Sequence, residues 1–157
     1  MKTLDNFNLI NKNILLRVDL NIPVVNGKIT DDSRIKIIIP TIKKLQIGKN
    51  KILIMSHFGR PKGEYNKFFS LEFMCATLAN NFNVERVNFI KDFNNKNIKE
   101  QINKMQPGDI CLLENIRFCP GEEKNDLDFL KEFCQNFDAF VNDAFSASHR
   151  NHASIVG

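Results

Sequence analysis

Residues 14–21 read ILLRVDLN, an apolar run broken by one arginine and ending in an acidic residue and an amide. Such a run predicts a strand buried on both faces, as in a parallel sheet covered by helices. Similar short apolar runs follow at residues 52–55, 87–90, 110–113 and 139–141. Segments with helical periodicity separate these runs. The alternation predicts an α/β fold with a parallel sheet of about five strands and helices on both faces.

The connections between the apolar runs carry turn and helix signals. Residues 24–29 contain the Asn-Gly pair typical of a tight hairpin. Residues 31–33 offer N-caps for a helix that runs toward Leu45 and ends near Gly48, and Pro40 should kink or split it. Three further helices are expected at residues 70–82, 97–105 and 125–137. No repeat or linker interrupts this pattern, so we expect one domain.

The composition excludes several protein classes. The chain has 157 residues, of which 43% are hydrophobic and 25% are charged. These values are typical of a globular domain and exclude a disordered, collagen-like or disulfide-scaffold chain. The net charge of +4 is too small to indicate a nucleic-acid partner by itself.

Several features favour a cytoplasmic protein. No apolar run approaches the length of a membrane span, and the N-terminal residues lack the apolar core of a signal peptide. The four cysteines form no C-x-x-C pair and have apolar neighbours. We interpret them as reduced thiols in or near the core, with a zinc or disulfide role as the minor alternative.

Polar side chains follow four of the five predicted strands. They are Asp19 and Asn21; Ser56, His57 and Arg60; Glu114, Asn115 and Arg117; and Asn142, Asp143, Ser148, His149 and Arg150. Open α/β sheets bind ligands at the carboxyl ends of their strands. Arg34 begins the first predicted helix, and several guanidinium groups at one cleft would suit a ligand with phosphate and carboxylate groups.

Each of these residues also has an ordinary structural interpretation. A single arginine after a strand is usually solvated, a lone His57 is more often a satisfied loop residue than a ligand-binding one, and Asp19 alone could cap a turn. Only their predicted position at one edge favours a site. The pattern by itself therefore supports no more than binding of a small anion.

The same segments resemble phosphoglycerate kinase, in the family's order and at the family's spacing. They are LLRVDLNIP (15–23), GKITDDSRI (27–35), PTI (40–42), MSHFGRPKG (55–63), LLENIRFCPGEEKND (112–126) and VNDAFSASHRNHAS (141–154). The resemblance covers essentially the whole chain.

The resemblance implies a glycolytic and gluconeogenic kinase. The family transfers a phosphoryl group reversibly between ATP and the carboxylate of 3-phosphoglycerate, giving 1,3-bisphosphoglycerate and ADP, with Mg²⁺. It is monomeric and has two α/β domains joined by a hinge. The Rossmann-like N-terminal domain holds the acid substrate, and the C-terminal domain holds the nucleotide. The resemblance thus implies a small-molecule substrate, with no nucleic-acid or membrane partner.

The resemblance also implies a role for individual residues. Asp19 and Asn21 match the pair near the hydroxyl and carboxylate of the substrate, and Arg34 matches the catalytic arginine at the reacting end. The residues implied around the 3-phosphate are His57, Arg60, Arg117 and Arg150, with Phe58 and Gly59 in the same segment. No metal or nucleotide ligand is expected in this chain.

The chain departs from the family in its length. Family members are far longer than 157 residues. The resemblance therefore implies that residues 1–157 are an incomplete N-terminal, 3-phosphoglycerate-binding domain, that the last strand of that domain and the nucleotide-binding domain are absent, and that the chain alone is inactive. An inert anion-binding domain or the remnant of a broken gene are the alternatives.

Overall fold

A central parallel sheet organises the structure, a computed structural model that describes residues 3–119 and 127–144. The sheet has five strands in the order β5-β6-β4-β1-β7, and all its pairings are parallel. The strands are β1 (Asn13–Val18), β4 (Lys51–Met55), β5 (Asn88–Ile90), β6 (Ile110–Leu113) and β7 (Ala139–Asp143). The parallel α/β fold predicted from the alternating pattern is confirmed.

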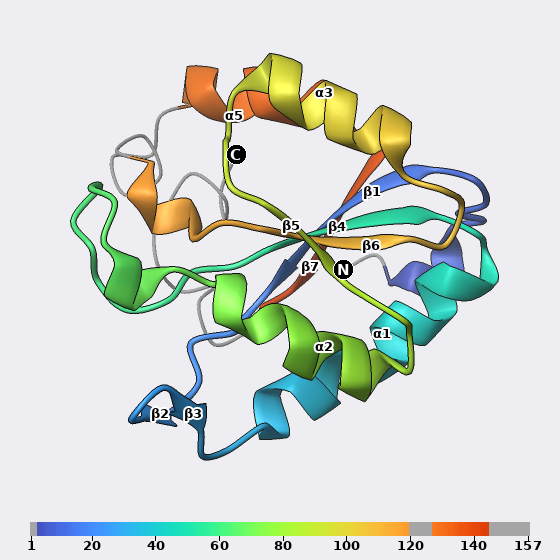
Figure 1. Ribbon diagram of the computed structural model, residues 1–157. Coiled ribbons are helices and arrows are strands. Elements are labelled where there is room, and N and C mark those ends of the chain that lie inside the picture. The colour runs from blue at the N-terminus through green and yellow to red at the C-terminus, as the bar shows by residue number, and fades with distance from the viewer. Residues whose placement is uncertain (1–2, 120–126, 145–157) are drawn as a thin grey trace.

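Helices cover both faces of the sheet (Figure 1). They are α1 (Ser33–Ile47), α2 (Cys75–Phe82), α3 (Asn95–Lys104) and α5 (Leu127–Cys134). Alternate residues of β1 point to opposite faces: Ile14 and Leu16 belong to the core under α1 and α2, and Leu15 belongs to the core that includes Ile98 of α3 and Phe133 of α5. Burial on both sides explains why the strands are almost continuously apolar.

Some helix boundaries differ from those predicted. Helix α1 continues through Pro40, so the proline does not split it. Helix α3 begins at Asn95 rather than Asn97, because the side chain of Asn94 accepts a hydrogen bond from the Lys96 N–H at 2.9 Å and caps the helix. The predicted start of the last helix near Asn125 lies outside the described residues.

The second predicted helix also begins later than expected. Residues Glu72–Met74 form a short 3₁₀ turn, and the α-helix itself starts at Cys75. Ser70, the expected cap, accepts a hydrogen bond from the Glu72 N–H at 3.3 Å, but its hydroxyl also donates to the carboxylate of Glu114. The serine therefore serves a tertiary contact as well as the turn.

The predicted hairpin is present between the sheet and α1. Strands β2 (Val24–Val25) and β3 (Lys28–Ile29) pair antiparallel across Asn26 and Gly27, whose φ angles are 52° and 73°. Positive φ at both central residues is the type I′ geometry that an Asn-Gly pair favours. The hairpin leads the chain from the end of β1 into α1 and so to Arg34 (Figure 1).

The cysteines are free thiols in the structure. Burial raises the pKa of Cys75 to about 11 and of Cys111 to about 12. Such thiols stay protonated near neutral pH and are poor nucleophiles and metal ligands. Within residues 3–119 and 127–144, no His, Cys, Asp and Glu side chains are grouped to hold a metal ion. In the same ranges no helix combines the length and apolar character needed to cross a bilayer.

Candidate functional site

The loops that follow β1, β4 and β6 meet at one edge of the sheet. These strands are neighbours in the order β6-β4-β1, so their carboxyl ends lie side by side. Ser56, directly after β4, joins both neighbouring loops. Its hydroxyl accepts from the Leu20 N–H at 2.9 Å, and its carbonyl accepts from the Ile116 N–H at 3.1 Å. The polar residues of three strand ends therefore share one edge.

Arg34 reaches this edge from the first turn of α1. Its Nη1 donates to the Asp19 carboxylate at 2.8 Å and to the Asn21 carbonyl at 2.9 Å. The Arg34 side chain is 44% exposed, and a partly exposed ion pair contributes only about 0–1 kcal/mol to stability. The pair therefore orients the guanidinium at the edge more than it stabilises the fold.

Gly59 connects the loop after β1 to Arg117. The Gly59 N–H donates to Asn21 Oδ1 at 3.1 Å, and the Gly59 carbonyl accepts from Arg117 Nη1 at 2.6 Å. Arg117 is only 3% exposed and lies in the turn η4 (Ile116–Phe118) after β6. Hydrogen bonds thus run continuously from Arg34 through Asn21 and Gly59 to Arg117.

The Gly59 position requires a residue without a side chain. Its φ is +61°, and a Cβ there would lie 2.3 Å from the ring of Phe69. Gly27 has a similar φ of +73°, but a Cβ there would have no neighbour within 4 Å. A side chain at either glycine would incur backbone strain, but only at Gly59 would it also overlap a neighbouring side chain.

We expect Gly59→Ala to destabilise the fold more than Gly27→Ala. The left-handed backbone alone costs about 1–2 kcal/mol, and displacing the Phe69 ring adds roughly 1–3 kcal/mol at Gly59 only. Urea denaturation of the two variants beside the wild type measures the difference. Equal losses in the two variants would show that Phe69 yields freely and that Gly59 is not sterically constrained.

The remaining predicted site residues differ in how far they are exposed to solvent. His57 is buried, at 4% exposure, immediately after Ser56, whereas Arg60 is exposed. Phe58 is half-buried, and its ring packs edge-on against Phe69 with centroids 6.5 Å apart. Arg150 lies outside the described residues, so the structure does not place it.

Glu114 and Asn115 make more hydrogen bonds to the loops at this edge than their sequence position indicated. Glu114 is 2% exposed and accepts hydrogen bonds from the Ser70 hydroxyl at 2.7 Å and from the N–H groups of Leu71 and Asn115 at 3.0 and 2.7 Å. A carboxylate that directly follows a fully buried strand is the signal that sequence reasoning could have weighed. Two of its three partners, Ser70 and Leu71, lie more than 40 residues away in sequence and could not be read from the pattern.

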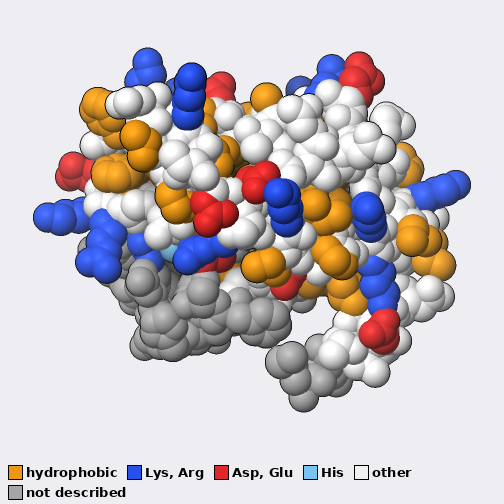
Figure 2. All heavy atoms as spheres, turned by 90° about the horizontal axis from the view of Figure 1, so that it is seen from below, with side chains coloured by type: hydrophobic (Ala, Val, Ile, Leu, Met, Phe, Trp, Pro, Cys, Tyr) orange, Lys and Arg blue, Asp and Glu red, His pale blue; other side chains and the backbone are white. Residues whose placement is uncertain are grey.

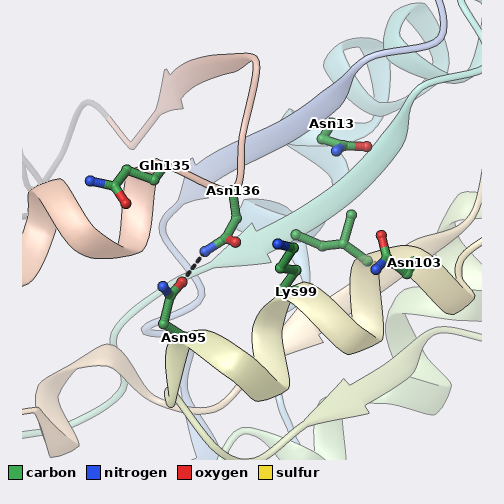
Figure 3. A pocket seen from close by; sticks show the side chains of 7 residues that line it. Asn13, Asn95, Lys99, Asn103, Gln135 and Asn136 are labelled. Atoms are coloured by element: carbon green, nitrogen blue, oxygen red, sulfur yellow. Dashed lines mark hydrogen bonds between the residues drawn. The ribbon is translucent and has the colours of Figure 1, made fainter.

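Three cavities lie away from this edge. One, of about 320 Å³, lies at the opposite end of the sheet beside Asn13, the first residue of β1, and is lined mainly by carboxamides together with Lys99 (Figure 3). In it Asn136 donates to Asn95. Cavities of about 460 and 750 Å³ lie along the N-terminal segment, the larger one also beside β7. The cavity of about 750 Å³ reaches Asp143 at the carboxyl end of β7, but none of these three cavities is lined by Arg34, Arg60 or Arg117. The arginine-bearing edge therefore remains the better candidate for binding an anion.

The surface charge is mixed on the face that α1 and α2 cover. Figure 2 shows Lys and Arg side chains interspersed with acidic and hydrophobic ones on this face. Among the described residues that this view shows, there is no broad surface of one sign such as nucleic-acid binding typically requires.

Comparison with known protein families covers nearly the whole chain. The family model described as phosphoglycerate kinase matches residues 4–157. The chain belongs to the phosphoglycerate kinase family. The resemblance inferred from the sequence motifs is therefore confirmed.

Curated phosphoglycerate kinases from several bacteria are similar over the same region. Those of Brucella melitensis and Agrobacterium fabrum are 44% and 45% identical to this chain, and each match covers 99% of the chain. In both cases the match covers 39% of the relative. The chain thus spans about two fifths of the length of these phosphoglycerate kinases.

Solved phosphoglycerate kinase structures share the fold. The structure from Coxiella burnetii superposes with a TM-score of 0.85 at 40% identity, covering 96% of this chain and 37% of the other. The structure from Pyrococcus horikoshii OT3 superposes with a TM-score of 0.89 at 34% identity, covering 100% of this chain and 40% of the other.

Proposed function

We propose that this chain provides the acid-substrate site of a phosphoglycerate kinase. In this proposal the edge formed by the loops after β1, β4 and β6 binds 3-phosphoglycerate or 1,3-bisphosphoglycerate. The reaction is the reversible phosphoryl transfer between ATP and the carboxylate of 3-phosphoglycerate. The observation that carries the proposal is the continuous set of hydrogen bonds from Arg34 through Asn21 and Gly59 to Arg117, in a chain of this family.

The proposed roles follow from charge and position. Arg34 serves the reacting end, where a guanidinium stabilises the negative charge of the phosphoryl group during transfer. Asp19 and Asn21, which already contact Arg34, orient the hydroxyl and carboxylate of the substrate. The groups proposed around the 3-phosphate are His57, Arg60, Arg117 and Arg150, with Phe58 and Gly59 shaping the loop.

ATP or ADP and Mg²⁺ belong to another part of the protein in this proposal. Among residues 3–119 and 127–144 no three His, Cys, Asp or Glu side chains are grouped for a metal ion, and the proposal places Mg²⁺ with the nucleotide. In this proposal the chain corresponds to an incomplete N-terminal domain. The nucleotide binds to a region that the relatives have and this chain does not span. The whole protein is proposed to act as a cytoplasmic monomer.

Residues 1–157 should bind 3-phosphoglycerate more tightly than glycerate. Each charge-assisted hydrogen bond is worth roughly 1.5–3 kcal/mol, so loss of the phosphate should weaken binding by well over about tenfold. Titration calorimetry with both ligands measures the difference. Arg60→Ala should reduce the difference in affinity between 3-phosphoglycerate and glycerate. Arg86→Ala removes an exposed arginine between α2 and β5 and should leave that difference unchanged. Equal affinities for the two ligands would contradict the assigned phosphate site.

A further inference from the structure

The side chain of Asn115 uses its full hydrogen-bonding capacity. It is 0% exposed, and its Oδ1 accepts from the N–H groups of Phe58 and Arg117 at 3.2 and 3.1 Å. Its Nδ2 donates to the carbonyls of Phe58 and Phe69 at 2.6 and 2.9 Å. A carboxamide has two donor hydrogens and two acceptor lone pairs, and all of them are engaged here.

These contacts hold both ends of the interaction between Arg117 and Gly59. Asn115 binds the backbone N–H of Arg117, and it binds both backbone groups of Phe58, the residue directly before Gly59. Arg117 Nη1 in turn reaches the Gly59 carbonyl at 2.6 Å. The contact therefore depends on a loop after β4 and a turn after β6, beyond the ends of both strands. Asn115 supplies hydrogen bonds there that the sheet does not.

Glu114 restrains the other end of the same loop. Its carboxylate accepts from the Ser70 hydroxyl and the Leu71 N–H, twelve and thirteen residues after Phe58. It also accepts from the N–H of Asn115 itself at 2.7 Å, which fixes the backbone from which the carboxamide projects. Asn115 therefore hydrogen-bonds to the start of the loop that carries Gly59 and Arg60, and Glu114 hydrogen-bonds to its end.

We infer that Asn115 is a positioning residue for the phosphate-binding part of the site. It fixes the position of Arg117 relative to the segment from Phe58 to Arg60. It acts on the substrate only through these residues and does not touch the substrate itself. The inference rests on the proposed function, because that proposal assigns Arg60 and Arg117 to the substrate's phosphate. An aspartate at this position could not replace it, because the oxygen in place of Nδ2 has no hydrogen to donate and would face the carbonyls of Phe58 and Phe69.

Asn50 provides a matched control. It is also 0% exposed, and its Oδ1 accepts from the Lys12 N–H at 2.9 Å. Its Nδ2 donates to the carbonyls of Leu9 and Leu45 at 2.9 and 2.8 Å. It precedes β4 and so lies at the amino end of the sheet, away from the candidate site. Asn50→Ala therefore removes a similarly bonded buried carboxamide without touching the arginines.

The experiment measures 3-phosphoglycerate and glycerate binding to residues 1–157 by calorimetry, below the melting temperature of each variant. Asn115→Ala should weaken 3-phosphoglycerate binding by about tenfold or more and glycerate binding by less than about threefold, since the phosphate arginines lose their alignment. Asn50→Ala should lower the melting temperature but leave both affinities within about twofold of wild type.

Asn115→Ser covers the case in which the alanine variant does not fold. A serine hydroxyl can still cap the turn at Arg117, because serine and asparagine are comparable caps, but it cannot bridge Phe58 and Phe69. We expect the same selective loss of 3-phosphoglycerate affinity. Wild-type affinity in either folded Asn115 variant would overturn the positioning role, as would an equal loss in Asn50→Ala. Both results leave the proposed function standing, whereas absence of 3-phosphoglycerate binding by the wild type would overturn the function and the inference together.

Discussion

Arg34→Ala should lower turnover by about 10²–10³-fold while changing the KM for 3-phosphoglycerate much less. The measurement uses a chimera in which residues 1–157 are continued by the remaining length of the Agrobacterium fabrum relative, 45% identical to this chain. Asp19 and the Asn21 carbonyl hold Arg34 Nη1 at 2.8 and 2.9 Å, so the guanidinium is oriented before substrate arrives. Charge that develops during transfer makes this group more important in the transition state than in the ground state.

Two further variants sharpen this prediction. Lys36→Ala removes a cation from the same helix turn, paired with Asp32 at 3.1 Å, and should leave turnover nearly unchanged. Arg34→Lys should restore little activity, because an ammonium cannot reproduce the planar, two-pronged geometry of a guanidinium. Near-normal turnover in Arg34→Ala would remove Arg34 from the catalytic machinery and leave it as a surface ion pair.

Residues 1–157 alone should show no phosphoryl transfer. Transfer is largely a matter of positioning and electrostatics, and the nucleotide must be held in line with the acceptor carboxylate. The chain spans 39% of the length of the Agrobacterium fabrum relative, and the proposal places the nucleotide in the part that the chain does not span. A coupled ATP assay beside the chimera measures the loss.

The control for this second prediction is the short chain carrying Arg34→Ala. Activity from a contaminating host kinase would be the same in both preparations. Turnover that is present in the short chain and lost in its Arg34→Ala variant would show that this chain holds the nucleotide itself. Binding of 3-phosphoglycerate by the short chain combined with turnover only in the chimera supports the proposed half-site. Binding without turnover in either protein would favour an inert anion-binding domain.

Much of the fold could be predicted from the sequence because the three central strands, β1, β4 and β6, are buried on both faces. Residues 14–18 and 52–55, for example, are apolar except for Arg17, and the structure places them at the centre of the sheet. The predicted end of the last strand at Val141 was two residues short. Asn142 and Asp143 are polar, yet they continue the parallel register beside Arg17 and Val18. The end of β7 is determined by its pairing with β1, and hydropathy contains no information on strand pairing.

The candidate site could be predicted only in part. The rule that parallel strands end at a common edge is enough to predict that Asp19, His57 and Arg117 lie at one edge. It could not identify the partners of each side chain. Asn115 and Phe58 are 57 residues apart, and their contact depends on strand order and loop path, which a single sequence does not encode in any local pattern.

The strand order also has a consequence for biosynthesis. Strand β1 is synthesised well before one of its two neighbours, β7, in which Ala139 pairs with Ile14. At translation rates of about 5–20 residues per second, Ala139 is added roughly 6–25 s after Ile14, because the two are 125 positions apart. During that interval the edge of β1 that later pairs with β7 has unpaired backbone hydrogen-bonding groups. The newborn chain therefore passes through a stage in which chaperones have time to bind it.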